Sequence, residues 1–150
     1  MEELAKLLIA RNISIASVES FTVGNFGASL GMVPVVSKIY KGTLVCYQNE
    51  IKERLAGIDK ATISKYGVVS KEVAGLMAIS GQNLFDSDIA VSFTGNAGPD
   101  VMEDKEAGLV YVGIKMEQVS VYELKLEGDR ATVIFQAVDF AVRKILENIK

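Results

Sequence analysis

The hydrophobic pattern of this chain has a helical period in several places. Apolar residues recur there every three or four positions, as on the buried face of a helix. The helices predicted in this way lie over 2–11, through Phe26 and Leu30 up to Pro34, over Ile51 to Leu55, and over 60–66, 71–84 and 130–149. Asp59 and Ser70 precede two of them and are predicted to be helix caps. The residues of 71–84 expected to face the core are Val73, Leu76, Met77 and Leu84.

Shorter apolar runs, bounded by glycine or polar residues, predict strands. They cover 13–18, 43–47, 88–93, 107–115 and 119–126. Glu117 and Gln118 separate the last two, which predicts a hairpin. Helices and strands alternate early and the hairpin comes late. The predicted fold class is therefore α/β, with a mixed, mostly parallel sheet covered by helices on both faces. The length fits a single domain over 1–150.

The stretch from Ile13 to Gly27 is the best candidate for a polar site. It runs from a strand through Glu19, Ser20 and Thr22 into a predicted helix. Unpaired N–H groups at a helix start attract anions, and open α/β sheets bind ligands at the carboxyl ends of their strands. A second loop, Thr94 to Pro99, also follows a predicted strand, so the two loops are expected to meet at one edge of the sheet.

Composition narrows the chemistry, because the chain has no histidine and one cysteine, Cys46. A Ser-His-Asp triad, a Cys-His pair and a Cys/His zinc site are therefore excluded within the chain. Any general base is Lys, Asp, Glu, Tyr or water. No apolar run is long enough to span a membrane, and the N-terminus resembles an amphipathic helix rather than a signal peptide. The formal net charge of -3 argues against a nucleic-acid surface.

Ser20 is the candidate nucleophile and Lys52 its candidate base. A serine needs a base to become a nucleophile, and burial lets a lysine act as one by lowering its pKa. Lys52 follows the second predicted strand and could face Ser20 if the first two strands pair. The alternatives are a helix-capping hydroxyl for Ser20 and a solvated surface amine for Lys52.

Other polar residues allow two interpretations each. Glu19 either orients a ligand or Lys52, or is an ordinary capping carboxylate, and Thr22 either binds a phosphate or caps the helix. Gly95 and Gly98 either belong to a site or only turn the chain. Arg130, in the first turn of the last helix, either binds an anion or is solvated.

Several short motifs occur in one order along the chain. They are Glu19-Ser20-x-Thr22-x-Gly24, Tyr47-x-Asn49-x-x-Lys52, Gly67-Val68-Val69-Ser70, Thr94-Gly95-x-Ala97-Gly98-Pro99, Gly108 and Gly128-Asp129-Arg130. Together they resemble the CinA C-terminal domain family, the nicotinamide-nucleotide amidases, over almost the whole chain. The resemblance implies a three-layer α/β/α domain that hydrolyses the carboxamide of nicotinamide mononucleotide to nicotinate mononucleotide and ammonia.

The resemblance also implies roles for individual residues. Ser20 and Lys52 correspond to the family's Ser-Lys pair, and Tyr47 to its tyrosine. The substrate-binding residues implied are Glu19, Thr22, Gly24, Asn49, Thr94, Gly95, Ala97, Gly98 and Arg130. No cofactor or metal is expected. A small nucleotide substrate, a cytoplasmic location and a homodimer or higher homo-oligomer are expected, with no nucleic-acid or membrane partner.

The chain departs from the family pattern within these same motifs. Phe21 and Val23 stand where the family has small residues, and Asn96 replaces an isoleucine. Ile134 stands where the family carries a second arginine, and the segment after Pro99 lacks the family's glycine-rich run. Two hypotheses follow: an active amidase, or a catalytically weakened relative that serves as a nucleotide-binding or assembly module.

Overall fold

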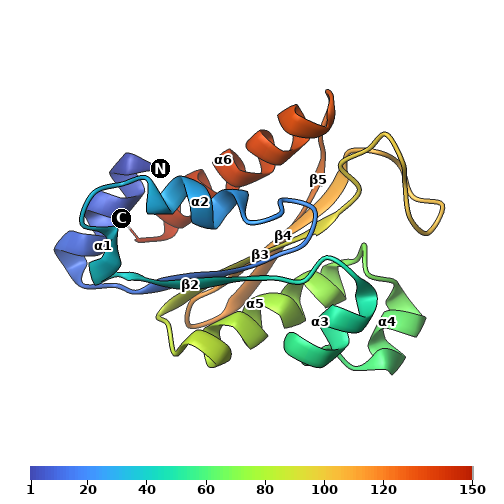
Figure 1. The fold of residues 1–150 in the computed structure, drawn as a ribbon, viewed down its shortest axis with the longest axis horizontal. Helices are drawn as coiled ribbons and strands as arrows, with labels where there is room; N and C mark the ends of the chain where they lie inside the picture. Colours follow the sequence, from blue (N-terminus) through green and yellow to red (C-terminus); the bar gives the residue numbers. More distant parts are fainter. Residues whose placement is uncertain (150) are drawn as a thin grey trace.

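The computed structural model describes residues 1–149, which form one sheet between two helical layers (Figure 1). The helices are α1 (Glu2–Arg11), α2 (Asn25–Gly31), the 3-10 helix η1 (Val36–Lys38), α3 (Asn49–Leu55), α4 (Lys60–Tyr66), α5 (Lys71–Phe85) and α6 (Arg130–Ile149). The strands are β1 (Ile15–Glu19), β2 (Tyr40–Val45), β3 (Ile89–Gly95), β4 (Leu109–Lys115) and β5 (Val119–Lys125). In the described range, no helix is both long and apolar enough to cross a membrane.

The five strands form a mixed sheet in the order β2-β1-β3-β4-β5. β1 lies between β2 and β3 and runs parallel to both, whereas β3–β4 and β4–β5 are antiparallel. The predicted α/β class and the late hairpin are thus confirmed. Four strands share one direction, and the pairings divide equally between parallel and antiparallel. The parallel pairings bring the carboxyl ends of β1, β2 and β3 to one edge.

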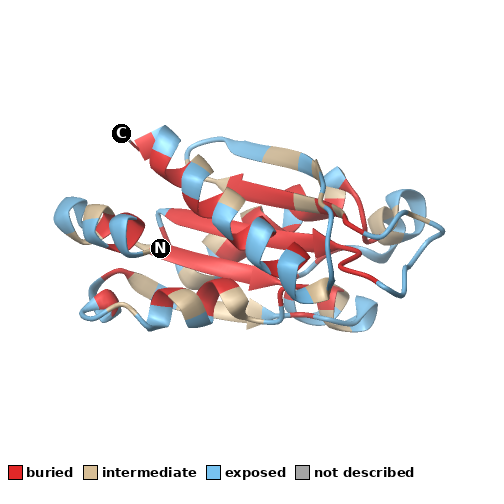
Figure 2. Ribbon diagram, turned by 90° about the horizontal axis from the view of Figure 1, so that it is seen from above, coloured by how far each residue is buried: buried red, intermediate tan, exposed pale blue. Residues whose placement is uncertain are grey.

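Helices cover both faces of the sheet, with α1, α2 and α6 on one side and α3, α4 and α5 on the other (Figure 1). The larger apolar cluster lies under α1, α2 and α6, and a smaller one around Val18, Cys46 and Met77 lies under α3 and α5. The central strands β1 and β3 are buried along their whole length (Figure 2). The stripe of α6, from Val133 to Ile149, is buried as its period predicts.

Two predictions about packing were wrong. Leu76 and Leu84 of α5 are 37% and 55% exposed, because the helix packs through a narrower face of Val73, Ala74, Met77, Ala78 and Gly81. That face is rich in small residues, which lets α5 lie close to the sheet: a Cβ on Gly81 would come 2.7 Å from Val18 Cγ2.

β2 begins and ends earlier than predicted. Gly42, expected to precede the strand, lies inside it opposite Ala16. A Cβ at Gly42 would lie 2.7 Å from the Phe85 ring, so this glycine allows the C-terminal end of α5 to pack against the strand.

Two valines occupy the left-handed backbone region, where a β-branched residue is strained. Val23 has φ 50° and, with Gly24 at φ 85°, forms a turn closed by the Asn25 N–H donating to the Thr22 carbonyl oxygen at 2.9 Å. Positive φ at both central positions is the type I′ arrangement that favours Asn-Gly. Val35 has φ 69° and follows Pro34, where a type II turn favours glycine.

Replacing either valine with glycine should therefore stabilise the fold. Each of Val23→Gly and Val35→Gly is expected to raise the free energy of unfolding by about 1 kcal/mol, measured by urea denaturation. Val45→Gly is the matched control, since Val45 is exposed in a strand with no positive φ and glycine weakens strands. A loss of stability in all three variants would show that Val23 and Val35 are not strained.

Candidate functional site

Ser20 lies directly after β1, at the edge where the three parallel strands end. Its N–H donates to the Phe93 carbonyl oxygen of β3 at 3.0 Å, and on the other side Cys46 N–H donates to the Glu19 carbonyl oxygen at 2.9 Å. These ladder bonds fix the backbone on both sides of Ser20. Its side chain is largely buried, and within the described chain its hydroxyl makes no hydrogen bond. The predicted position of Ser20 is thus confirmed, and its hydroxyl is available to a ligand.

The Glu19 carboxylate is completely buried and fastens the loop that follows Ser20. It accepts hydrogen bonds from Ser17 Oγ at 3.0 Å and Thr22 Oγ1 at 2.7 Å, and from the backbone N–H groups of Phe26 at 3.2 Å and Gly27 at 2.9 Å. The last two belong to the first turn of α2, where a carboxylate is favourable. Glu19 therefore positions the loop, and no hydrogen bond or ion pair among residues 1–149 joins it to Lys52.

A pocket of about 190 Å³ lies beside Ser20. Its lining residues are Ser20, Phe21, Tyr47, Gly95, Asn96, Ala97, Asp100, Val101, Met102 and Arg130. Five of the predicted site residues meet here, from three strand ends and the start of α6. Phe21 is buried in the core under the pocket, so its bulk points mainly inward.

Lys52 lies outside the lining of this pocket but is linked to it through Tyr47. Its side chain is completely buried, and Nζ donates to the Tyr47 carbonyl oxygen at 2.9 Å. Burial lowers the pKa of Lys52, while Cys46 and Glu103 act in the opposite direction. Its interpretation as a solvated amine is wrong. No hydrogen bond connects Nζ to the Ser20 hydroxyl in the described structure.

Arg130 joins two walls of the pocket. Its Nη2 donates to the Tyr47 hydroxyl at 2.9 Å, and its Nη1 donates to the Gly98 carbonyl oxygen at 2.9 Å. A guanidinium held at two points presents its remaining N–H groups in a fixed direction, which suits an anion. A second hollow of about 460 Å³, lined by residues around Gly98, Gly128 and Arg130, adjoins the first through Ala97 and Arg130.

Several predicted site residues do not line the pocket. Thr22 is bonded to Glu19, and Thr94 Oγ1 donates to the Val68 carbonyl oxygen at 2.7 Å, so both hydroxyls have internal partners. Gly24 forms the turn before α2, and Asn49 is exposed at the start of α3. Gly95 is needed for packing as well, because a Cβ there would lie 2.6 Å from Val110 Cα.

One wall of the pocket, formed by Asp100, Val101 and Met102, was not predicted from the sequence. Their segment, 100–105, has the polar composition that is typical of mobile surface loops, yet side-chain hydrogen bonds tie it down on both sides. A usable signal was its place directly after the loop Thr94 to Pro99. Among residues 1–149 no group of three or more acidic or cysteine side chains could hold a metal ion.

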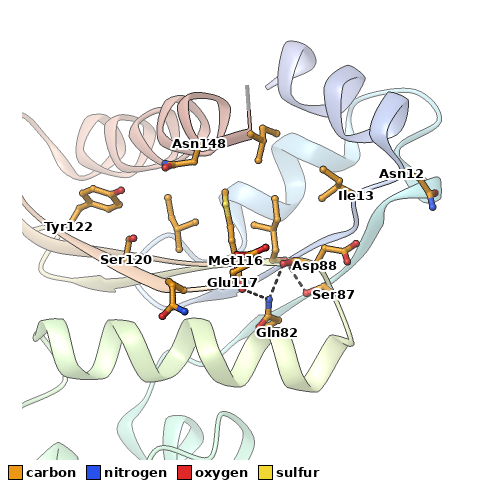
Figure 3. A pocket seen from close by; sticks show the side chains of 14 residues that line it. Asn12, Ile13, Gln82, Ser87, Asp88, Met116, Glu117, Ser120, Tyr122 and Asn148 are labelled. Atoms are coloured by element: carbon orange, nitrogen blue, oxygen red, sulfur yellow. Dashed lines mark hydrogen bonds between the residues drawn. The ribbon is translucent and has the colours of Figure 1, made fainter.

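A larger hollow, of about 850 Å³, lies at the opposite end of the sheet (Figure 3). It is lined by Ile13, Asp88, Met116, Tyr122 and their neighbours, and includes none of the predicted site residues. Gln82 Nε2 crosses its floor to the carbonyl oxygens of Asp88 and Met116. Size alone therefore does not identify the site, and the strand-end pocket carries the candidate chemistry.

Comparison with known proteins gives one consistent family. The family described as the CinA C-terminal domain matches residues 1–149. A competence-damage inducible protein of Shouchella clausii is 39% identical over 145 residues, covering 95% of this chain and 35% of that protein. One from Bacillus subtilis is 36% identical over 148 residues, covering 98% and 36%. The chain thus spans about a third of the length of these curated relatives.

Solved structures agree with these sequence matches. A CinA superfamily protein from Klebsiella pneumoniae superimposes with a TM-score of 0.96 at 29% identity, covering 99% of this chain and 94% of that one. One from Escherichia coli gives 0.93 at 28% identity, covering 97% and 86%.

The buried Glu19 carboxylate should be essential to stability. Glu19→Gln replaces two acceptor oxygens by one acceptor and an NH₂ group that faces donors, so the free energy of unfolding should fall by about 2–3 kcal/mol. Glu50→Gln, at an exposed position of α3, should change it by less than about 0.5 kcal/mol. Equal effects of the two substitutions in urea denaturation would show that the Glu19 hydrogen bonds do not hold the loop.

Proposed function

The chain belongs to the CinA C-terminal domain family, and we propose that it hydrolyses the carboxamide of nicotinamide mononucleotide, giving nicotinate mononucleotide and ammonia. One observation carries the proposal. The unpartnered Ser20 hydroxyl faces a pocket whose wall, Tyr47, also holds the buried amine of Lys52. In a chain without histidine, a buried lysine in its neutral form can serve as the base that activates a serine for amide hydrolysis.

In the proposed reaction Lys52 Nζ, in its neutral form, takes the Ser20 proton while Ser20 Oγ bonds to the carboxamide carbon. The C–N bond then breaks, the proton passes to the leaving nitrogen, and ammonia departs. Water attacks the resulting ester, releases the carboxylate and restores the serine hydroxyl. The missing hydrogen bond between Ser20 and Lys52 has to form on substrate binding, as catalytic contacts often tighten in the complex.

Backbone N–H groups at the pocket could stabilise the oxyanion. Phe21 and Ala97 both line the pocket, and within residues 1–149 their N–H groups donate to no acceptor. They belong to two loops held by ladder bonds and by Glu19, so their directions are set before substrate arrives. Preorganised donors of this kind supply a large part of the rate enhancement in acyl transfer.

The second hollow fits the rest of a nucleotide. It adjoins the Ser20 pocket at Arg130 and lies at the N-terminus of α6, a 20-residue helix. A phosphate there would meet the guanidinium and the positive end of the helix dipole. The ring with its carboxamide would then lie against Ser20 and the ribose phosphate beyond Arg130.

A nucleotide-binding relative without catalysis is the second candidate. It is favoured by Lys52 Nζ binding the Tyr47 carbonyl instead of Ser20. It is also favoured by the strained Val23 in the nucleophile's own loop. Such a module would bind nicotinamide mononucleotide and release no ammonia.

Ammonia release from nicotinamide mononucleotide decides between the two. The parent protein should release ammonia, Ser20→Ala should abolish release, and Lys52→Met should reduce it by about 10²–10⁴-fold. Lys52→Met should keep or raise the unfolding temperature, because it replaces a buried amine by an apolar chain of similar length. Lys60→Met, at an exposed lysine of α4, is the control with parental activity. A parent that binds the nucleotide without releasing ammonia would contradict the amidase.

The pH dependence should report the ionisation of Lys52. Because burial lowers its pKa, kcat/KM should rise with pH at an apparent pKa below the ordinary 10.5. In that window the unfolded chain binds more protons than the folded one, so the free energy of unfolding should also rise with pH. Lys52→Met should remove this part of the rise. An activity that is flat with pH, or that declines as pH increases towards 10.5, would exclude Lys52 as the base.

A further inference from the structure

The segment 100–105, here named the strap, forms one wall of the Ser20 pocket. It follows Pro99 and presents Asp100, Val101 and Met102 to the cavity. Asn96 holds its base: Oδ1 accepts from Met102 N–H at 3.0 Å, and Nδ2 donates to the carbonyl oxygens of Met102 at 3.1 Å and Lys105 at 3.2 Å. Asn96 is nearly fully buried, so this anchor is shielded from water.

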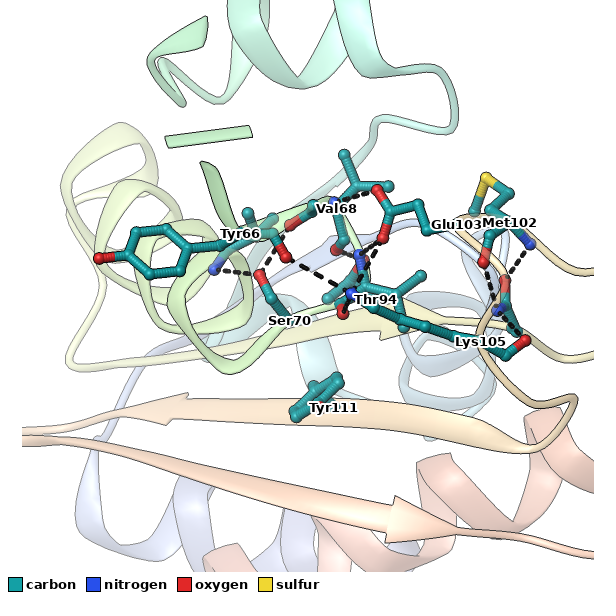
Figure 4. A network of polar contacts seen from close by, with 12 residues as sticks. Tyr66, Val68, Ser70, Thr94, Met102, Glu103, Lys105 and Tyr111 are labelled. Atoms are coloured by element: carbon teal, nitrogen blue, oxygen red, sulfur yellow. Dashed lines mark hydrogen bonds and ion pairs between the residues drawn. The ribbon is translucent and has the colours of Figure 1, made fainter. Parts of the chain in front are cut away.

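Glu103 is the second anchor of the strap, and it reaches across to the turn before α5 (Figure 4). Its Oε1 accepts from Val68 N–H at 2.6 Å and its Oε2 from Val69 N–H at 3.2 Å. Gly67 makes room for it, since a Cβ there would lie 2.4 Å from Glu103 Oε2. A carboxylate on two successive N–H groups is a strong, directional contact.

Lys105 strengthens the contact between Glu103 and the turn before α5. Its Nζ donates to the Val69 carbonyl oxygen at 2.6 Å and lies 3.1 Å from Glu103 Oε2. The turn that receives both side chains is itself fixed, because Ser70 Oγ donates to the Gly67 carbonyl oxygen and Thr94 Oγ1 to that of Val68. The strap is therefore pinned to the rigid frame of β3 and α5.

The contact of Glu103 and Lys105 with the turn before α5, here named the pin, also affects Lys52. The charge of Glu103 raises the pKa of Lys52 against the effect of burial, as does Cys46 at the end of β2. Lys105, beside Glu103, carries the compensating positive charge. Removing the Glu103 charge would lower the pKa of Lys52 further and so favour its neutral amine, while the hydrogen bond from Nζ to the Tyr47 carbonyl oxygen does not involve Glu103.

We propose that Glu103 is a positioning residue that holds the strap as a preformed wall for the substrate's ring. The proposal rests on the amidase function for its kinetic readout. The hydrogen bonds of the Ser20 backbone N–H and of Lys52 Nζ do not involve Glu103, so substrate binding suffers more than the chemical step. The expected signature is a rise in KM with kcat largely retained.

The test compares Glu103→Ala, Glu103→Gln and the control Glu106→Gln. Within residues 1–149 the Glu106 side chain makes only an exposed ion pair, with Lys125. Glu103→Ala should raise KM for nicotinamide mononucleotide about tenfold, because a tenfold change corresponds to the loss of one charge-assisted contact. The kcat of this variant should stay within about twofold of the parent's. Glu103→Gln keeps one acceptor oxygen and should give an intermediate KM. Glu106→Gln should match the parent.

Hydrogen exchange gives a readout independent of turnover. The amides of Val68, Val69 and Met102 should exchange about tenfold faster or more in Glu103→Ala and remain parental in Glu106→Gln. Unchanged exchange would refute the pin, and faster exchange with unchanged KM would refute its role in substrate binding. If the parent releases no ammonia, the proposed amidase function is refuted independently of the role of Glu103. The Kd for nicotinamide mononucleotide then replaces KM, and unaltered affinity in Glu103→Ala overturns the proposal.

Discussion

A buried carboxylate organises the candidate site. Glu19 is removed from water at the end of β1, and among residues 1–149 no lysine or arginine forms an ion pair with it. An uncompensated charge in such a place is very costly, so its four hydrogen-bond donors are obligatory partners. Satisfying them draws Thr22 and the first turn of α2 onto the strand end. The chain between must turn sharply, and the left-handed Val23 and Gly24 lie within that turn.

The candidate site divides two tasks between the two faces of the sheet. Glu19 and α2 lie on one face and set the direction of the Ser20 loop. Lys52 belongs to α3, which lies on the other face (Figure 1), and its side chain is buried there. Tyr47 links Lys52 to the pocket. Its carbonyl oxygen accepts a hydrogen bond from Lys52 Nζ, and its hydroxyl accepts one from Arg130 Nη2 at the pocket. Both the strained loop and the dry amine cost stability, as sites built for chemistry commonly do.

Local patterns were enough to predict the order of helices and strands, the caps at Asp59 and Ser70, and Ser20 at a strand end. These follow from periodicity and turn chemistry, which act over a few residues. The partners of Glu19 and Lys52 could not be predicted, since hydrogen bonds across the fold leave no periodic trace. The same holds for the strap, where a polar sequence typical of a loose loop is pinned by Glu103 to a turn 34 residues away. Leu76 and Leu84 were misplaced because hydrophobicity alone ranks leucine above the alanine and glycine that make close packing of α5 possible.

The covalent step on Ser20 is the central claim, and it can be observed directly. A single turnover with protein in excess over nicotinamide mononucleotide, quenched in acid and analysed by peptide mass spectrometry, should reveal a transient ester on the peptide that contains Ser20. Its mass should equal that of the substrate less ammonia, and it should decay as nicotinate mononucleotide forms. Ammonia release with an ester on any other residue would contradict the assignment of Ser20 as the nucleophile.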